Sequence, residues 1–361
     1  MKTTLKDVAR DAGVSVATVS QALGGKGRIA EDTQKRIFDA AKRLGYRIRS
    51  IPPREAIEGR NTVGILLLVD SKWSFLWGFI RPIIDSIEGS LRERGYATII
   101  IPIKADRSTR DILQSILVSG VRAVFSIHYG NEPLFEKLES FNIPVVVIMN
   151  NRYQDRFYSI GADDFQGAYE GTLYLIKLGH RTIAFVESER SEMPLLMSDR
   201  FTGFKKALDE SSIPFLERNR IRFNSTNKDD LEAKLERIMK VNDAPTALFA
   251  LDDDIGLHVF FILEKMGFSI PKDLSVICPG DVLDYLQPYV PKLTTMSIDT
   301  SYMGRLAADM MYNRLQGDFE YIHALKIKEQ LTLRESCRFI GNTDVKGPHD
   351  MKFAHDKGIQ Y

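Results

Sequence analysis

The spacing of three residues near the N-terminus restricts the first part of this chain to one small motif. Ala9 is followed by Gly13 four positions later and by Val19 six positions after that. The small side chain of Ala9 lets two helices approach closely, Gly13 permits a tight turn between them, and Val19 packs the second helix against the first. This pattern predicts a helix-turn-helix.

Capping residues mark the ends of both helices. Thr4 precedes a helical stretch over 5–12, and Asp7 completes a capping-box pattern three residues later, while Ser15 can cap a second helix that runs to about residue 23. A third amphipathic helix should end at Gly45. Apolar residues on the inner faces can form a small core, namely Leu5, Val8, Val14, Val19, Leu23, Ile37, Ala40, Ala41 and Leu44.

The outer face of the second helix then carries Val16, Ala17 and Gln21. In a helix-turn-helix this face lies in the major groove of DNA and contacts base edges. The alternative is an ordinary three-helix surface module, but charge favours nucleic acid. Residues 1–60 hold thirteen Lys and Arg against seven Asp and Glu, whereas residues 61–361 hold 36 basic and 41 acidic side chains. A basic head on a mildly acidic body is typical of a nucleic-acid-binding arm on a globular domain.

The 361 residues suffice for two or three domains. The start MKTTLKDVAR has no apolar run, so we expect no secretory signal, and the apolar stretches at 63–69 and 143–149 are too short to span a membrane. Two cysteines, Cys278 and Cys337, are too few for a disulfide framework, which fits a reducing compartment. We therefore expect a cytoplasmic protein without a membrane partner.

Beyond residue 60, short apolar strands alternate with amphipathic helices. This alternation predicts an α/β fold of two doubly wound parallel-sheet halves, with ligand bound in a cleft at the carboxyl ends of the strands. The expected strands cover 62–69, 97–103, 123–127, 145–149, 182–186, 220–223, 246–250 and 274–278. The expected helices cover about 80–91, 109–119, 132–141, 165–178, 200–210, 253–266 and 301–315.

Sequence signatures of catalysis are scarce. The chain lacks a GxGxxG after the first strand, a Walker A loop, HExxH, GxSxG and a CxxC pair. The acidic runs Asp163-Asp164 and Asp252–Asp254 favour helix caps and ligand hydrogen bonds over a metal, because His258 is the only histidine close to either run. His180 is expected to support a turn rather than act as a base. We therefore expect no enzyme, no cofactor and no metal site.

At this point the chain resembles the lactose-repressor (LacI/GalR) family of bacterial transcription regulators, over roughly residues 4 to 337. The resemblance lies in TLKDVARDAGVSVATVSQAL, LGHRTIAFVE at 178–187, RFTGFKKAL at 200–208, the segment 245–277, LTTMSIDTSYMGRLAADMM at 293–311 and LRES at 333–336. It implies a DNA-binding head, a hinge, and a core similar to periplasmic sugar-binding proteins. It also implies homodimers that bind palindromic operator DNA, with a small effector in the cleft.

These implications divide the chain into four parts. We expect the helix-turn-helix head over 1–46, a hinge over 47–61, an effector-binding and dimerisation core over 62–340, and a polar tail over 341–361. Within the core, the chain is expected to pass between the two halves near 161–163, 296–299 and 326–330.

The resemblance also assigns DNA contacts. Val16, Ala17 and Gln21 fall where the family contacts bases, and many members have arginine at position 21. Arginine suits guanine, whereas glutamine suits adenine, so the half-site should differ from the common one at one base. The residues placed to touch phosphates are Thr18, Ser20, Lys26, Arg28 and Thr33, with a solvated polar face as the alternative.

The hinge departs from the family pattern. Family members commonly fold this segment into a short helix on DNA and insert a leucine into the minor groove. Here Pro52 and Pro53 fall where helix would form, and Glu55 stands at the leucine position. Proline disrupts a helix interior, and phosphate charge repels a carboxylate. Ile51 and Ile57 are the apolar residues left to serve as a wedge in a shifted register.

The expected effector site matches the family in part. Trp73, Trp77 and Phe79 can stack on a sugar ring, with structural burial as the alternative for Phe79 and its neighbour Phe75. Arg200 stands at the family's effector-contacting arginine, Asp252 replaces the usual asparagine, and Asp163 is a further acceptor. Gly280 replaces an aspartate that often contacts ligand, which leaves Asp281, and Ile298 stands where members often carry glutamine. A carbohydrate or related metabolite is the expected effector.

The sequence thus predicts a two-state dimeric repressor whose operator affinity changes with effector binding. One alternative is a cleft-type solute-binding protein without specific operator binding. A second is a sugar-metabolising enzyme with a DNA-binding head, and a third is a regulator whose pocket has lost its ligand.

Overall fold

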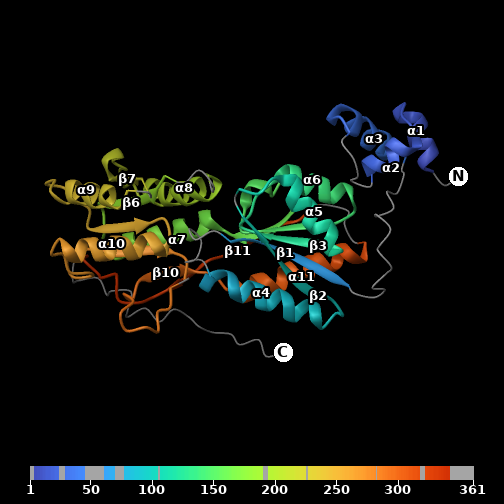
Figure 1. Ribbon diagram of the computed structural model, residues 1–361. Coiled ribbons are helices and arrows are strands. Elements are labelled where there is room, and N and C mark those ends of the chain that lie inside the picture. The colour runs from blue at the N-terminus through green and yellow to red at the C-terminus, as the bar shows by residue number, and fades with distance from the viewer. Residues whose placement is uncertain are drawn as a thin grey trace.

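The computed structural model describes most of the chain, and Figure 1 draws its helices and strands. The described residues are 4–23, 29–44, 61–69, 77–104, 106–189, 194–224, 227–281, 283–317 and 322–341. Among the described helices, none is long and apolar enough to cross a membrane.

The N-terminal head consists of three helices, α1 (Leu5–Ala12), α2 (Val16–Leu23) and α3 (Glu31–Arg43). The Asp7 carboxylate accepts hydrogen bonds from the Thr4 N–H at 2.9 Å and from the Thr4 hydroxyl at 2.6 Å. Ser15 Oγ accepts from the Thr18 N–H at 3.0 Å. Gly13 ends α1 with φ +65°, a backbone conformation that glycine adopts without strain. The three predicted helices and the caps at Thr4 and Ser15 are confirmed, whereas Gly45, the predicted end of the third helix, lies outside the described residues.

The head has a hydrophobic core of its own. Val8, Val19 and Ile37 each come from a different helix and are fully buried. Ala9 and Ala12 are 4% and 6% exposed, so small side chains do lie where α1 meets its neighbours. Leu5, Val14, Ile29 and Leu44 are partly buried around this cluster. The head is therefore a packing unit in its own right.

The described residues after the head form two six-stranded sheets covered by helices. The first sheet has the order β11 (Ala324–Ile327), β5 (Tyr158–Ala162), β4 (Val145–Ile148), β3 (Ala123–Ile127), β1 (Thr62–Leu68) and β2 (Ala97–Ile103). The second has the order β12 (Gln330–Thr332), β10 (Thr294–Ser297), β9 (Ser275–Pro279), β8 (Ala247–Ala250), β6 (Ile183–Ser188) and β7 (Arg220–Phe223). Neighbouring strands are parallel except for β10 and β12.

Helices cover both faces of the first sheet (Figure 1). On one face lie α4 (Trp77–Arg92) and α11 (Thr300–Gln316), which pack on strand side chains such as Ile65 and Phe125. On the other lie α5 (Thr109–Ser119) and α6 (Glu132–Ser140). Because helices cover both faces, β3, β4 and β5 are buried along their whole length.

The second sheet is covered by four helices, α7 (Asp164–Lys177), α8 (Pro194–Glu210), α9 (Lys228–Met239) and α10 (Asp253–Lys265). Two 3₁₀ turns complete the described elements, η2 (Asn151–Tyr153) and η3 (Glu217–Asn219). The predicted α/β class with two doubly wound halves is confirmed.

Within the described segments, the chain passes between the two sheets three times. It leaves the first sheet after β5 and enters α7, returns from β10 to α11, and crosses again between β11 and β12. Each sheet with its helices is a subdomain, named here the first and the second after their order in the chain. The three connections make this junction the natural place for a hinge between the subdomains.

Several elements differ from the sequence-based expectation. The strands β5, β10, β11 and β12 were not predicted. Three of them carry polar or exposed residues, and β5 is interrupted by Ser159 and Gly161. The helix predicted over 200–210 begins at Pro194 instead. The four missed strands lie at the crossings, whereas α8 lies between β6 and β7 of the second sheet.

His180 fastens two strands of the second sheet. Its Nδ1 lies 2.9 Å from Thr246 Oγ1 and its Nε2 lies 3.0 Å from Ser275 Oγ, just before β8 and at the start of β9. The side chain is buried, and this burial lowers the pKa of His180 to about 4. The expectation that His180 supports a turn rather than acts as a base agrees with this position.

Folding stability should therefore depend on His180 in mild acid. The unfolded state binds a proton below about pH 6.5, whereas the folded state resists protonation down to about pH 4. The contribution is fully present above pH 6.5 and is lost as pH falls through that window, by about 2 kcal/mol at pH 5. Urea unfolding at pH 7.5 and 5.0 should show a smaller acid loss for His180→Gln than for the wild type. The exposed His258→Gln should behave as the wild type, and equal acid losses in all three proteins would refute the assignment.

The contact between α7 and α8 depends on glycine. A Cβ at Gly203 would collide with the main-chain oxygen of Phe165, whereas a Cβ at Gly89 in α4 meets nothing within 4 Å. Gly203→Ala should therefore destabilise the protein by about 2 kcal/mol or more, while Gly89→Ala should be neutral or stabilising by up to about 1 kcal/mol. Thermal unfolding of both variants checks this, and equal midpoints would contradict the packing described.

Candidate functional site

The face of α2 that was predicted to contact DNA bases is open to solvent. Val16 is 41% exposed, and Ala17 and Gln21 are also exposed. On the opposite side, Val19 and Ala22 are buried in the core of the head. Helical periodicity thus separates a packing side from an open side made of short side chains and one amide. Base contact by these residues stays a prediction.

The residues assigned to phosphates lie in different settings. Thr18 is half-buried, and its hydroxyl lies 2.8 Å from Ser15 Oγ at the start of α2. Ser20 is exposed and Thr33 is half-buried near the start of α3. Lys26 and Arg28 lie outside the described residues, as do the hinge residues Ile51, Pro52, Pro53, Glu55 and Ile57 and the aromatic Trp73.

The two described aromatic residues of the expected effector site differ in exposure. Trp77 is the first residue of α4 and is 49% exposed, so its ring is available to a ligand. Phe79 is 7% exposed and packs in the hydrophobic core, with its ring centroid 6.1 Å from that of His128. Phe79 is therefore buried in the structure, as in the alternative given for it in the sequence analysis.

Arg200 is buried, and its guanidinium is bonded within the protein. Its Nε and Nη2 lie 3.0 and 2.9 Å from Asp164 Oδ1, and its Nη1 donates to the Leu251 carbonyl at 2.6 Å. Nη2 also lies 3.7 Å from Glu329 Oε1. Asn151 Nδ2 donates to the other Asp164 oxygen at 3.1 Å. An effector that contacts Arg200 must therefore share it with these internal partners.

The sequence did not single out Glu329 or Asp164 as partners of Arg200, and ligand contact by Asp163 stays a prediction. Glu329 is 3% exposed, and its burial raises its pKa to about 8, with Arg200 opposing and Asp164 adding to the effect. The double acid at 163–164 was a visible signal, but Glu329 sits in a stretch with no periodic pattern. Only the fold brings it to Arg200.

The acidic runs cap helices, as expected. Asp163 accepts from the Gln166 N–H at 3.4 Å at the start of α7, and Asp252 accepts from the Ile255 N–H at 2.8 Å at the start of α10. Within the described ranges, no group of three or more acidic, histidine or cysteine side chains could hold a metal ion.

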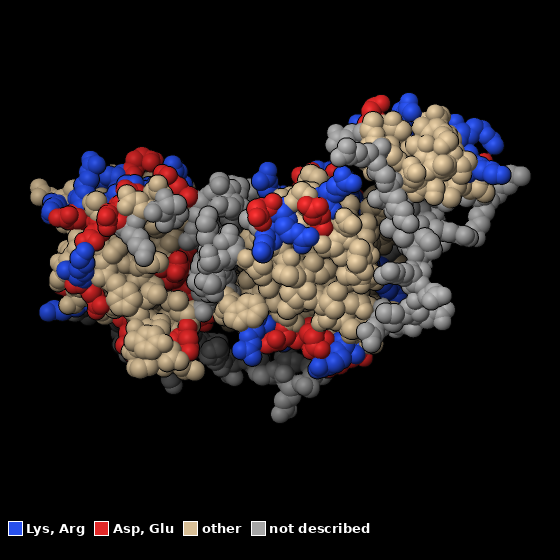
Figure 2. All heavy atoms as spheres, viewed as in Figure 1, with Lys and Arg blue, Asp and Glu red and all other residues tan. Residues whose placement is uncertain are grey.

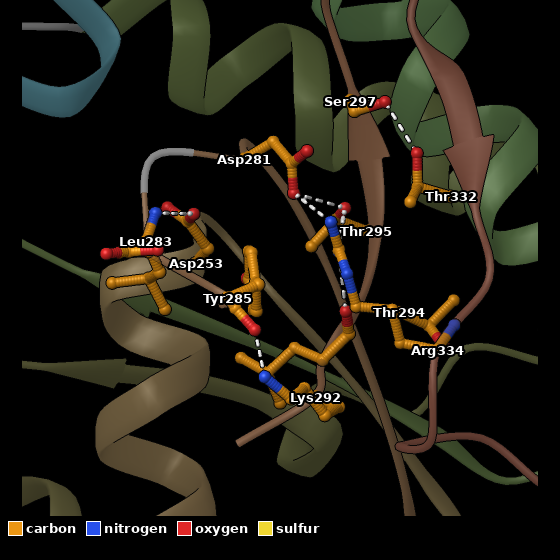
Figure 3. Close-up of polar contacts among 12 residues, drawn as sticks. Asp253, Asp281, Leu283, Tyr285, Lys292, Thr294, Thr295, Ser297, Thr332 and Arg334 are labelled. Carbon is orange, nitrogen blue, oxygen red and sulfur yellow. Dashed lines mark hydrogen bonds and ion pairs between the residues drawn. The ribbon is translucent and has the colours of Figure 1, made fainter. Parts of the chain in front are cut away.

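Asp281 belongs to a second polar cluster, drawn in Figure 3. Its carboxylate accepts from Arg334 Nη2 at 2.8 Å and from Thr295 Oγ1 at 3.1 Å. Arg334 also donates to the Leu293 carbonyl at 2.9 Å and lies over the Tyr285 ring at 3.8 Å. These contacts hold the loop after β9 against β10, so Asp281 has a structural role in addition to its predicted ligand contact.

The position of Asp253 accounts for the glycine at residue 280. Gly280 has φ +111°, and a Cβ there would lie 2.8 Å from Asp253 Oδ1. The Asp253 carboxylate, 2% exposed, therefore occupies the space that a side chain at position 280 would need. Asp253 Oδ2 also accepts from the Leu283 N–H at 3.4 Å (Figure 3).

A helix-turn-helix head joined to two parallel-sheet subdomains defines a class of DNA-binding proteins with a ligand-binding core. Residues 4–48 match the model for bacterial regulatory proteins of the lacI family, and residues 172–337 match the model for a periplasmic binding protein-like domain. The chain belongs to the lacI family of bacterial regulatory proteins.

Individual relatives match over nearly the whole chain. The HTH-type transcriptional repressor PurR of Actinobacillus pleuropneumoniae serotype 3 (strain JL03) is 27% identical over 346 residues, which cover 93% of this chain and 98% of the relative. Among solved structures, the complex of transcriptional regulator CelR with cellobiose has a TM-score of 0.67 at 23% identity, covering 92% of this chain and 99% of that one. The lac repressor dimer bound to operator and the anti-inducer ONPF has a TM-score of 0.64 at 19% identity, covering 94% and 100%.

The contrast between Trp77 and Phe79 can be tested by truncation. Phe79→Ala removes a buried ring and should cost about 3 to 5 kcal/mol of unfolding free energy. Trp77→Ala removes a half-exposed ring and should cost less than about 1 kcal/mol. Urea unfolding measures both. A Trp77→Ala loss as large as that of Phe79→Ala would mean that the indole serves packing and is not held ready for a ligand.

Proposed function

We propose that this protein is a sequence-specific regulator of transcription, most simply a repressor, that binds a palindromic operator as a homodimer. The observation that carries the proposal is the open face of α2, which presents Val16, Ala17 and Gln21 while the opposite face packs in the core. This is the geometry by which a helix-turn-helix enters the major groove. The family membership and the relatives named as transcriptional repressors support it.

The phosphate contacts of the proposal come from Thr18, Ser20, Lys26, Arg28 and Thr33. They would fix the position of the head on the duplex without selecting a sequence. On the visible face of the head in Figure 2, basic side chains outnumber acidic ones, which favours an approach to polyanionic DNA. The head would occupy 1–46, the hinge 47–61, and the core 62–340.

A small effector is proposed to bind between the two subdomains. The half-exposed Trp77 and the carboxylates of Asp163 and Asp252, which follow β5 and β8, suit a polyhydroxylated molecule such as a carbohydrate. The site would also include Phe79, Arg200 and Asp281. Each of these is packed against or bonded to other protein groups, so they would hold the ligand-contacting side chains in position. The cellobiose complex of a structurally similar regulator supports a sugar-sized ligand for this fold.

Selection from randomised duplex DNA at moderate salt tests the function. The purified full chain should enrich a palindrome with one half-site for each head. Binding that enriches no sequence and only fades with rising salt would reject specific recognition. The protein would then be assigned to the cleft-type solute-binding class.

Gln21 should select adenine within each half-site. Its amide can pair with adenine N6 and N7, whereas arginine pairs with guanine O6 and N7. Gln21→Arg should therefore change the preferred base at one position from adenine to guanine, with discrimination of about 10-fold or more, since a bidentate pair contributes about 1 to 3 kcal/mol. Competition binding with duplexes that differ at this base measures the shift.

Gln34→Arg, on α3, is the matched control because it adds the same charge to the same head away from the reading face. It should tighten binding to all sequences by a similar factor and leave the base preference unchanged. An unchanged preference in Gln21→Arg would remove this residue from base recognition.

A further inference from the structure

A buried charged cluster lies where the chain passes between the two subdomains. Asp164 is the first residue of α7, directly after the crossing from β5, and Glu329 lies in the crossing between β11 and β12. Arg200 in α8 lies between them, 2.9 Å from Asp164 Oδ1 and 3.7 Å from Glu329 Oε1. Two of the three crossings are thus joined by one guanidinium.

The cluster is sealed from water. The side chains of Arg200, Asp164 and Glu329 are 7%, 2% and 2% exposed. Gly167 leaves room for Glu329, because a Cβ at this glycine would fall on the Glu329 carboxyl. The Gln166 amide bonds the main chain of Glu329 in both directions, at 3.3 and 3.0 Å. The carboxyl is therefore held in a fitted space.

The cluster is also bonded to the first subdomain. Asn151, in the 3₁₀ turn that follows β4, donates to Asp164 at 3.1 Å. Lys326 in β11 lies 3.7 Å from Asp199, the neighbour of Arg200 in α8. A change in the angle between the two subdomains must stretch or break these links.

The charges of the cluster do not balance when all three groups are ionised. One guanidinium faces two carboxylates, which leaves a buried net charge of −1. Arg200 is closer to Asp164, which also accepts from Asn151, so a proton is best placed on Glu329. Within the described part of the chain, Glu329 Oε2 is buried and has no hydrogen-bond partner, as suits an oxygen without full negative charge.

The surroundings favour the protonated form of Glu329. Acidic neighbours are more numerous than basic ones, and His128, whose pKa burial lowers to about 4, stays neutral. The charged and titratable groups that face the cluster are Asp163 and Asp164 at the start of α7, Asp199 and Arg200 in α8, Asp252 before α10, Lys326 in β11 and His128 after β3.

We propose that Asp164, Arg200 and Glu329 form a proton-dependent lock between the two subdomains, which is closed while the Glu329 carboxyl carries a proton. Ionisation of Glu329 leaves an uncompensated buried charge, and the cluster relieves it by opening the crossings to water. Because burial raises the pKa of Glu329 to about 8, this change falls within one pH unit of neutrality. Its regulatory consequence rests on the proposed function, since the angle between the subdomains would set the spacing of the two DNA-binding heads.

Energy transfer between two dyes measures the angle in the full-length protein. Lys137→Cys in α6 and Lys205→Cys in α8 place the dyes on exposed positions of the first and second subdomains, and the native Cys278 and Cys337 are buried. Transfer efficiency in the doubly labelled protein should change in one step between pH 7 and 9, with a midpoint near 8.

Three variants in this labelled background test the cause. Glu329→Gln imitates the protonated carboxyl and should hold the low-pH transfer efficiency up to pH 9. Gly167→Ala displaces the Glu329 carboxyl, so its transfer efficiency should stay at the high-pH value of the wild type over the whole range. This variant tests the lock even if Glu329→Gln fails to fold. The exposed Glu335→Gln is the matched control and should keep the wild-type step. A wild type without a step, or one shared by Glu329→Gln or Gly167→Ala, would overturn the proposal.

Binding to the duplex selected above separates the lock from the function. Operator affinity of the wild type should change between pH 7 and 9 by at least threefold more than that of Glu329→Gln. Equal changes in both proteins would refute the regulatory consequence. If selection enriches no DNA, the proposed function fails, while the energy-transfer step still decides whether the lock exists.

Discussion

The burial of one guanidinium organises the junction of this molecule. Arg200 is 6% exposed, and an unpaired charge at such a position would cost several kcal/mol. Its partners come from α7, from the end of β8 and from the crossing before β12, segments that are distant in the sequence. Pairing Arg200 with these groups therefore ties α8 to α7, to the end of β8 and to the crossing before β12, next to the junction of the two subdomains.

The DNA-binding head and the ligand-binding subdomains have separate hydrophobic cores, so one can affect the other through their relative positions. The head buries Val8, Val19 and Ile37 among its own helices, so the cluster that holds α2 in place contains only residues of the head. The subdomains carry the strand ends where a ligand would bind, and three connections join them. A ligand or a proton that favours one relative angle can thus change where two rigid heads stand, without altering either head.

Local sequence rules predicted those parts whose structure is set by near neighbours. The caps at Thr4 and Ser15, the turn at Gly13 and the alternation of buried strands with helices follow from spacing alone. The crossing strands could not be predicted in this way, because β11 and β12 are short and gain stability only from the strands beside them. For the same reason Glu329 carried no local signal, and Phe79 was indistinguishable from a ligand-facing aromatic until its packing was known.

The three crossings also have a consequence for how the protein is made. The head has all the residues of its core once Leu44 has left the ribosome, so it can fold as soon as it emerges. Neither larger subdomain has that option, since the first lacks α11 and β11, and the second lacks β12, until residues 300–332 have been synthesised. Both subdomains can complete their folds only when almost the whole chain has been synthesised. During synthesis, the DNA-binding head can therefore be folded well before the ligand-binding subdomains are.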